Sequence, residues 1–113
     1  MRKEQSGGQF LEQSTHTTDL ARFFFGEVTH VYAVPVRSRR RRPRYFSVED
    51  ASMVQLKFAG GAAANIYSSC CTTMGSGISL TVWGTDMLAC FSDWHHNVTI
   101  DLPKGEHYEV GAE

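Results

Sequence analysis

Apolar residues in the first quarter of the chain recur at the spacing of an α-helix. The pattern covers residues 10–25, and Gly26 follows at the position where a glycine commonly caps a helix. Ser14 and Thr15 offer a second N-cap inside this stretch, so the helix begins either near Phe10 or about one turn later. The pattern therefore predicts one helix that ends at Gly26.

The remainder of the chain alternates apolar and polar residues with the period of β-strands. Short turns rich in glycine, proline and aspartate separate the alternating stretches, and strands joined by such turns pair antiparallel. The turns are Gly60-Gly61, Gly84-Thr85-Asp86 and Pro103-Lys104-Gly105. The predicted strands are residues 28–36, 52–58, 62–71, 78–83, 87–91, 97–102 and 107–110.

One helix and six or seven strands predict an α+β fold, in which an open, predominantly antiparallel sheet carries the helix on one face. Several strands have apolar residues on both faces, for example Val31 beside Tyr32 and Met53 near Leu56. A sheet that is apolar on both faces and covered by a single helix leaves an exposed patch, and such patches commonly mediate association. We therefore expect a homo-oligomer formed through the open sheet face.

The length of 113 residues predicts a single domain, residues 1–113, with a core of its own. It excludes a nucleotide-binding domain and a substrate domain side by side. No apolar run approaches the roughly 18–20 residues of a membrane span, and no signal-peptide pattern follows Met1. The three cysteines, Cys70, Cys71 and Cys90, are an odd number in unrelated places, which favours reduced thiols in the cytoplasm.

Charge is concentrated in one segment. Six of the eleven cationic residues lie between Arg37 and Arg44; the net charge is −1, so the rest of the chain carries −7. Mutual repulsion and Pro43 predict a mobile, solvated loop over residues 37–46. Nucleic acid is an unlikely partner, because no aromatic residues alternate with the arginines and the acidic body repels a polyanion. An anionic substrate or a neighbouring subunit remains an alternative partner for this loop.

The strongest candidate site is a line of polar residues on the predicted helix. Glu12, His16 and Asp19 follow one another in steps of four and three residues, which places them on one helical face, and Phe23 continues the line. An imidazole beside a carboxylate can remove a proton from a substrate hydroxyl, while a second acid orients the ring or holds another hydroxyl. The alternative interpretation is the solvated polar face of a capped helix.

Three segments in order resemble the C-terminal domain of the Gfo/Idh/MocA oxidoreductases. Gly7-Gly8 precedes an acid-x-x-x-His pattern formed by Glu12 and His16, Asp19 follows three residues later, and the helix ends at Gly26. Residues 48–62 are similar to the family's acidic residue, apolar strand and Gly-Ala hairpin, and residues 82–86 are similar to its strand with a Gly-Thr turn. The resemblance extends from Gly7 to about Leu102.

The resemblance implies a fold, a chemistry and partners. In this family a Rossmann domain binds NAD or NADP, and the C-terminal domain supplies residues that contact the substrate. His16 would be the catalytic acid/base, Glu12 would orient it or bind a hydroxyl, and Asp19 would contact the substrate. The implied substrate is a sugar, polyol or cyclitol, and the family's usual subunit interface is the open sheet face.

The sequence departs from the family pattern in two respects. Glu12 stands where aspartate is more common, and no Gly-x-Gly-x-x-Gly or Glu-Lys-Pro motif is present for a cofactor. The implied function is therefore the substrate-binding and oligomerisation domain of an NAD(P)-dependent oxidoreductase, inactive alone and without a cofactor of its own. The alternative is a non-catalytic interaction module of the same fold.

Other side chains are weaker candidates. Tyr67 and Trp94 are aromatic residues that would stack on a sugar, although ordinary packing is the more common reason for such residues. No metal site is expected, because neighbouring residues on a strand point to opposite faces, so neither a His-His nor a Cys-Cys pair chelates one ion easily. The residues concerned are His95, His96, His107, Cys70 and Cys71.

Overall fold

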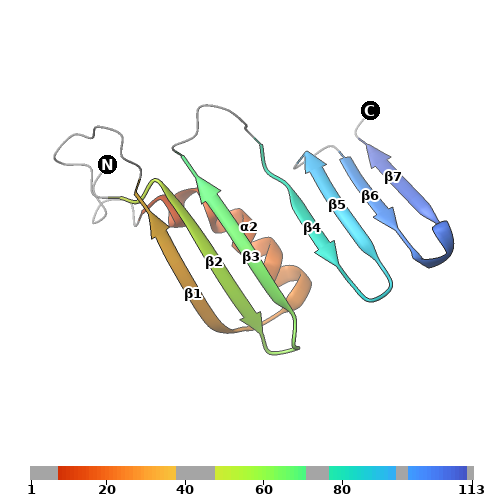
Figure 1. Ribbon diagram of the computed structural model, residues 1–113, viewed down its shortest axis with the longest axis horizontal. Coiled ribbons are helices and arrows are strands. Elements are labelled where there is room, and N and C mark those ends of the chain that lie inside the picture. Colours follow the sequence, from red (N-terminus) through yellow and green to blue (C-terminus); the bar gives the residue numbers. More distant parts are fainter. Residues whose placement is uncertain (1–7, 38–47, 71–76, 94–96, 112–113) are drawn as a thin grey trace. The chain divides into compact units, whose positions relative to one another are not determined.

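The computed structural model describes residues 8–37, 48–70, 77–93 and 97–111. Contacts divide the chain into two compact units, Met1–Thr73 and Met74–Glu113, and we treat each by itself. The first unit contains the helix α2 and strands β1–β3, and the second contains strands β4–β7 (Figure 1). The Arg-rich loop predicted for residues 37–46 lies outside the described residues, except for Arg37.

The helix α2 (Gln9–Phe25) is continuous, so the chain does not use the alternative start at Ser14 or Thr15. Ser14 is instead buried within the helix. The predicted end is confirmed: the Gly26 N–H donates to the Arg22 carbonyl at 2.8 Å, and Gly26 has a φ of 82°, which a glycine adopts without strain.

A carboxylate from a distant part of the sequence closes the N-terminus of α2. No local side chain caps this end, but the Phe10 N–H donates to Glu49 Oε1 at 3.2 Å. Gly8, with φ 109°, allows this approach, since a Cβ at that position would lie 2.9 Å from Glu49 Oε1. An anion here satisfies an otherwise unpaired N–H and faces the positive end of the helix dipole.

The first sheet consists of β1 (Val28–Val36), β2 (Ala51–Phe58) and β3 (Ala63–Ser69), paired antiparallel in the order β1-β2-β3. The predicted turn at Gly60-Gly61 joins β2 and β3, and the Phe58 N–H donates to the Ala62 carbonyl at 2.9 Å. The prediction of antiparallel strands joined by short turns is confirmed for this unit.

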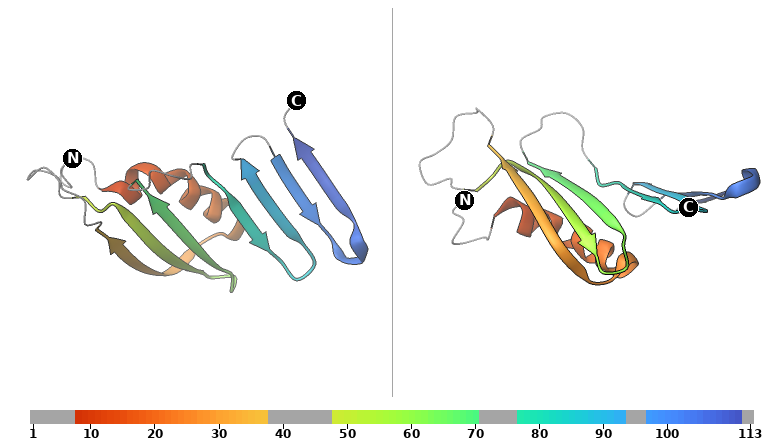
Figure 2. Two further views of the ribbon diagram at one scale, coloured as in Figure 1. Left: turned by 45° about the horizontal axis from the view of Figure 1, so that its top comes forward. Right: turned by 60° about the horizontal axis from the view of Figure 1, so that its bottom comes forward.

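The alternation of buried and exposed residues along β2 shows which face of this sheet is covered and which is open. The residues of this strand alternate between buried and exposed from Ser52 to Phe58, and α2 packs against the buried face over β2 and β3 (Figure 2). Phe58 is 1% exposed, and its ring centroid lies 5.4 Å from that of Phe25. The core cluster is Ala21, Val54, Leu56, Phe58 and Ile66.

The second sheet consists of β4 (Leu80–Trp83), β5 (Leu88–Asp93), β6 (Asn97–Asp101) and β7 (His107–Gly111), paired antiparallel in that order. A short 3-10 turn, Pro103–Gly105, joins β6 to β7. Cross-strand partners share a face, and the register places most apolar residues of the four strands on one face, while Trp83 and Leu88 pair on the other. The residues on the first face are Leu80, Val82, Ala89, Phe91, Val98, Ile100, Tyr108 and Val110.

The α+β class, the single main helix and the antiparallel strands are confirmed. Within the described residues, three strands are hydrogen-bonded to one another in the first unit and four in the second. No described helix is both long and apolar enough to cross a membrane.

Replacing Glu49 by alanine is expected to lower the free energy of unfolding by about 1 kcal/mol, because the first turn of α2 loses an acceptor and a favourable charge. Glu49→Gln keeps an acceptor but not the charge, so it should cost less. Urea denaturation of the three proteins measures both differences. An alanine variant as stable as the parent would show that the contact contributes nothing.

Candidate functional site

The buried residues of α2 determine which face of the helix points outward. Ser14 and Ala21 are small and buried, which lets the helix approach the sheet closely. Their positions leave His16, Asp19 and Phe23 on the exposed side, and Phe23 is 81% exposed. The predicted common face of these three residues is therefore confirmed, and it points away from the core of its own unit.

Glu12 lies on α2 one turn before His16, at the position that the sequence predicts. Its side chain is outside the part of the chain that the structure describes. The backbone therefore places Glu12 in line with His16, and its role as an orienting acid remains a prediction.

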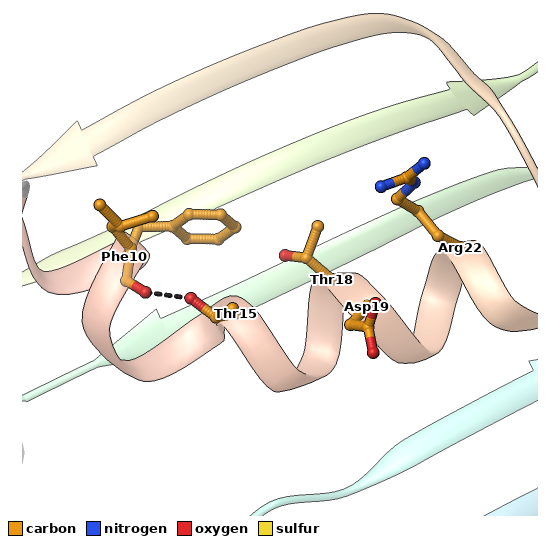
Figure 3. Close-up of a pocket in the computed structure, with 6 residues that line it drawn as sticks. Phe10, Thr15, Thr18, Asp19 and Arg22 are labelled. Carbon is orange, nitrogen blue, oxygen red and sulfur yellow. Dashed lines mark hydrogen bonds between the residues drawn. The ribbon is translucent and has the colours of Figure 1, made fainter.

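A shallow hollow of about 220 Å³ runs along α2 beside this line (Figure 3). Asp19 belongs to the hollow, whereas His16 is not among its lining residues. The hydroxyl of Thr15 donates to the Leu11 carbonyl, and that of Thr18 donates to the Ser14 carbonyl at 2.9 Å, which leaves both oxygens able to accept a hydrogen bond. The lining residues are Phe10, Leu11, Thr15, Thr18, Asp19 and Arg22.

The sequence did not lead us to predict that Thr15, Thr18 and Leu11 line a hollow beside the candidate site. The signal was present, because residues 11, 15, 18 and 22 follow helical spacing one residue behind the line of His16. At the end of the hollow, Arg22 forms an ion pair with Glu27 at 3.4 Å, with both side chains largely exposed. Such a pair contributes roughly 0–1 kcal/mol.

Aromatic rings connect the exposed line to the core. The ring centroids of Phe23 and Phe24 lie 5.5 Å apart in an edge-on arrangement, and those of Phe24 and Phe25 lie 6.2 Å apart. Phe25 in turn contacts Phe58. This series of contacts holds the last turn of α2 and fixes the direction of its exposed face.

The remaining sugar-stacking candidates do not join this site. Tyr67 lies on β3 opposite Met53, and both are exposed on the sheet face opposite α2, where Tyr67 is 64% exposed. The sheet therefore separates Tyr67 from His16 and Asp19 within one chain. Trp94 lies outside the described residues.

The described residues contain no cluster of three or more metal-ligating side chains. His95, His96 and Cys71 lie outside the described residues. The thiol of Cys70 donates to the Asp50 carbonyl at 3.2 Å, and the Cys70 N–H donates to the same oxygen at 2.8 Å. These contacts account for Cys70 as a structural residue at the end of β3.

An imidazole–carboxylate pair that the sequence did not predict joins β6 to β7. His107 Nδ1–H donates to Asp101 Oδ1 at 2.5 Å, between residues that are direct cross-strand partners. This hydrogen bond, followed by the charges of Asp101 and Glu109, raises the pKa of His107 above its ordinary 6.5. The pair closes the hairpin next to the turn at Pro103–Gly105.

Together, these features define a class: an α+β domain that presents a histidine and an aspartate on the outer face of its one main helix. The described residues contain only antiparallel pairings, without the parallel β–α–β crossover that binds dinucleotides. The chain belongs to the family of the GFO/IDH/MocA C-terminal domain, whose model matches residues 1–89.

Solved structures share this fold. A crystal structure of an oxidoreductase from Agrobacterium radiobacter in complex with NAD+, L-tartaric acid and magnesium superposes with a TM-score of 0.73 and 22% identity over 92% of this chain. Levoglucosan dehydrogenase in complex with NADH and levoglucosan gives a TM-score of 0.76 and 22% identity over 93% of this chain. The chain spans only 30% and 31% of these two proteins. Comparison with curated proteins finds no match.

The Asp101–His107 pair makes a stability contribution that depends on pH. Because the folded pKa of His107 is raised, this contribution is fully present below pH 6.5 and is lost as the pH rises through the folded pKa. NMR titration should find the pKa of His107 above 6.5, and Asp101→Asn should lower it toward that value.

Denaturation over a pH series provides the second measurement. The parent should have a higher free energy of unfolding than His107→Gln. This difference should be largest at acidic pH and should shrink toward alkaline pH. An Asp101→Asn variant with an unchanged His107 pKa would contradict the assigned cause.

Proposed function

We propose that this chain is the substrate-binding part of an NAD(P)-dependent oxidoreductase that acts on a hydroxyl of a sugar, polyol or cyclitol. The observation that carries the proposal is the exposed line of His16 and Asp19 on α2. The alternative, a polar helix face that only contacts water, does not require a hollow in the surface beside it. Here an apolar and hydroxyl-lined hollow adjoins the line and shares Asp19 with it.

The roles follow from the chemistry of each group. His16 accepts the proton of the substrate hydroxyl, because an imidazole nitrogen with a free lone pair serves as a general base. Asp19 accepts a hydrogen bond from a second hydroxyl, and Thr15 and Thr18 line the same hollow with oxygen acceptors. Glu12, one turn before His16, orients the imidazole or binds a further hydroxyl.

The described residues do not fit a dinucleotide cofactor. A pyrophosphate binds at a helix N-terminus that follows a parallel strand. The N-terminus of α2 is instead closed by the Glu49 carboxylate, which would repel a phosphate from the Phe10 N–H. NAD or NADP would therefore be held by another part of the parent enzyme, facing the exposed side of α2.

The relatives support the substrate class. One of the two solved relatives binds levoglucosan with NADH, and the other binds L-tartaric acid with NAD+. Both ligands carry at least two alcoholic hydroxyl groups on a small carbon skeleton, and L-tartaric acid carries two carboxyl groups in addition. A site with one histidine, one aspartate and two threonines suits such a ligand, because each hydroxyl both donates and accepts a hydrogen bond.

Association through the open face of the first sheet is the second part of the proposal. This face carries Val34, Met53 and Tyr67, which are cross-strand partners in register across three strands, and Tyr32 two residues before Val34; all four are exposed. A contiguous apolar patch on a sheet face favours packing against a second copy. In this arrangement Tyr67 contacts the partner copy rather than the substrate of its own α2.

The experiment is His16→Ala in the complete parent enzyme, which carries the cofactor part. Loss of the proton acceptor should reduce kcat by about 10²–10⁴-fold, with a smaller change in KM. Gln13→Ala, also on the exposed side of α2, is the matched control and should retain activity. Unchanged turnover in His16→Ala would remove the catalytic assignment and leave a non-catalytic interaction module.

A further inference from the structure

Strand β1 forms an edge of the first sheet, with β2 as its neighbour in the described part of the chain. It is nine residues long, and its sequence, Val-Thr-His-Val-Tyr-Ala-Val-Pro-Val, contains no lysine, arginine, aspartate or glutamate. An edge strand of this length and composition is a template for pairing with another strand. Val31 and Tyr32, at its centre, are 64% and 66% exposed.

The features that usually prevent such pairing are confined to the two ends of β1. A register shift interrupts the ladder between Val28 and His30, and Pro35 lies one residue before the other end. The central residues, 30–34, carry neither a bulge nor a charged side chain. Pairing of β1 with another strand is therefore hindered at the two ends of β1 but not at its centre.

Pro35 also indicates which backbone groups face outward. Proline has no N–H, so within a sheet it is tolerated where its nitrogen points away from the neighbouring strand. Residues two and four positions earlier point the same way, which directs the N–H and C=O groups of Ala33 and Val31 outward. These two residues form the centre of the open edge.

We propose that β1 pairs antiparallel with β1 of a second copy of this chain, about a two-fold axis through Tyr32. This register sets Val31 of one copy opposite Ala33 of the other, and about six backbone hydrogen bonds form across the junction. The two first sheets then become one six-stranded sheet. This contact is separate from the association through the sheet face and does not depend on the catalytic proposal.

Charges at the ends of β1 complement this register. Glu27 directly precedes the strand; its side chain is 80% exposed, and the carboxylate that pairs with Arg22 of its own chain has a second oxygen for another cation. Arg37 directly follows the strand and is exposed. An antiparallel pair centred on Tyr32 brings Arg37 of one copy beside Glu27 of the other. The bulge near Thr29 displaces the two positions by one residue, which a long arginine side chain spans. The two-fold axis makes this contact twice.

The test uses sedimentation equilibrium of the chain carrying Tyr67→Glu, which removes association through the sheet face. Tyr67 lies on β3, separated from β1 by β2. A concentration-dependent dimer should remain. Glu27→Arg or Arg37→Glu alone converts two attractions into two repulsions and should weaken the dimer about tenfold. The double variant, Glu27→Arg with Arg37→Glu, should restore the affinity.

A second pair of variants tests the edge without altering these charges. Val31→Lys places a charge at the centre of β1 and should abolish the dimer. Asn65→Lys places the same side chain on β3, which β2 separates from β1, and should leave the dimer intact. A strictly monomeric Tyr67→Glu protein would overturn the proposal. So would a dimer that resists Val31→Lys, or one that the double charge reversal fails to restore.

Discussion

Which side of α2 packs against the sheet is the constraint on which the candidate site depends. Small buried residues, Ser14 and Ala21, press one side of the helix onto β2 and β3, and Phe25 meets Phe58 at its end. A rotation by one residue would bury His16 or Asp19 and expose part of the core. The same packing that stabilises the unit therefore presents the polar line outward.

The residues at the two ends of α2 determine which ligands the helix can bind. Glu49 occupies the positive N-terminus, which in a dinucleotide-binding fold would hold a pyrophosphate, and Gly8 allows the carboxylate to come close. At the other end Gly26 stops the helix and directs the chain into β1. The N-terminus of α2 is therefore occupied, and what the helix offers to other molecules is the row of side chains on its exposed face.

Much of this could be predicted from the sequence. Helical spacing predicted the helix, its end and the common face of His16, Asp19 and Phe23. Alternation predicted the seven strands to within two residues at every end. The register of the strands was not predictable, because periodicity does not specify which residues of two strands pair. The contact of Glu49 with Phe10 and the Asp101–His107 pair were also missed, since each depends on residues brought together by tertiary structure or register.

The central claim is that this chain offers a substrate face and relies on another part of its enzyme for the cofactor. Titration of the isolated chain with NADH, followed by the fluorescence of the nicotinamide, tests this most directly, with an intact relative such as levoglucosan dehydrogenase as the positive control. The account predicts no saturable signal from the chain at any concentration at which the relative is saturated. Saturable binding at one NADH per chain would contradict it.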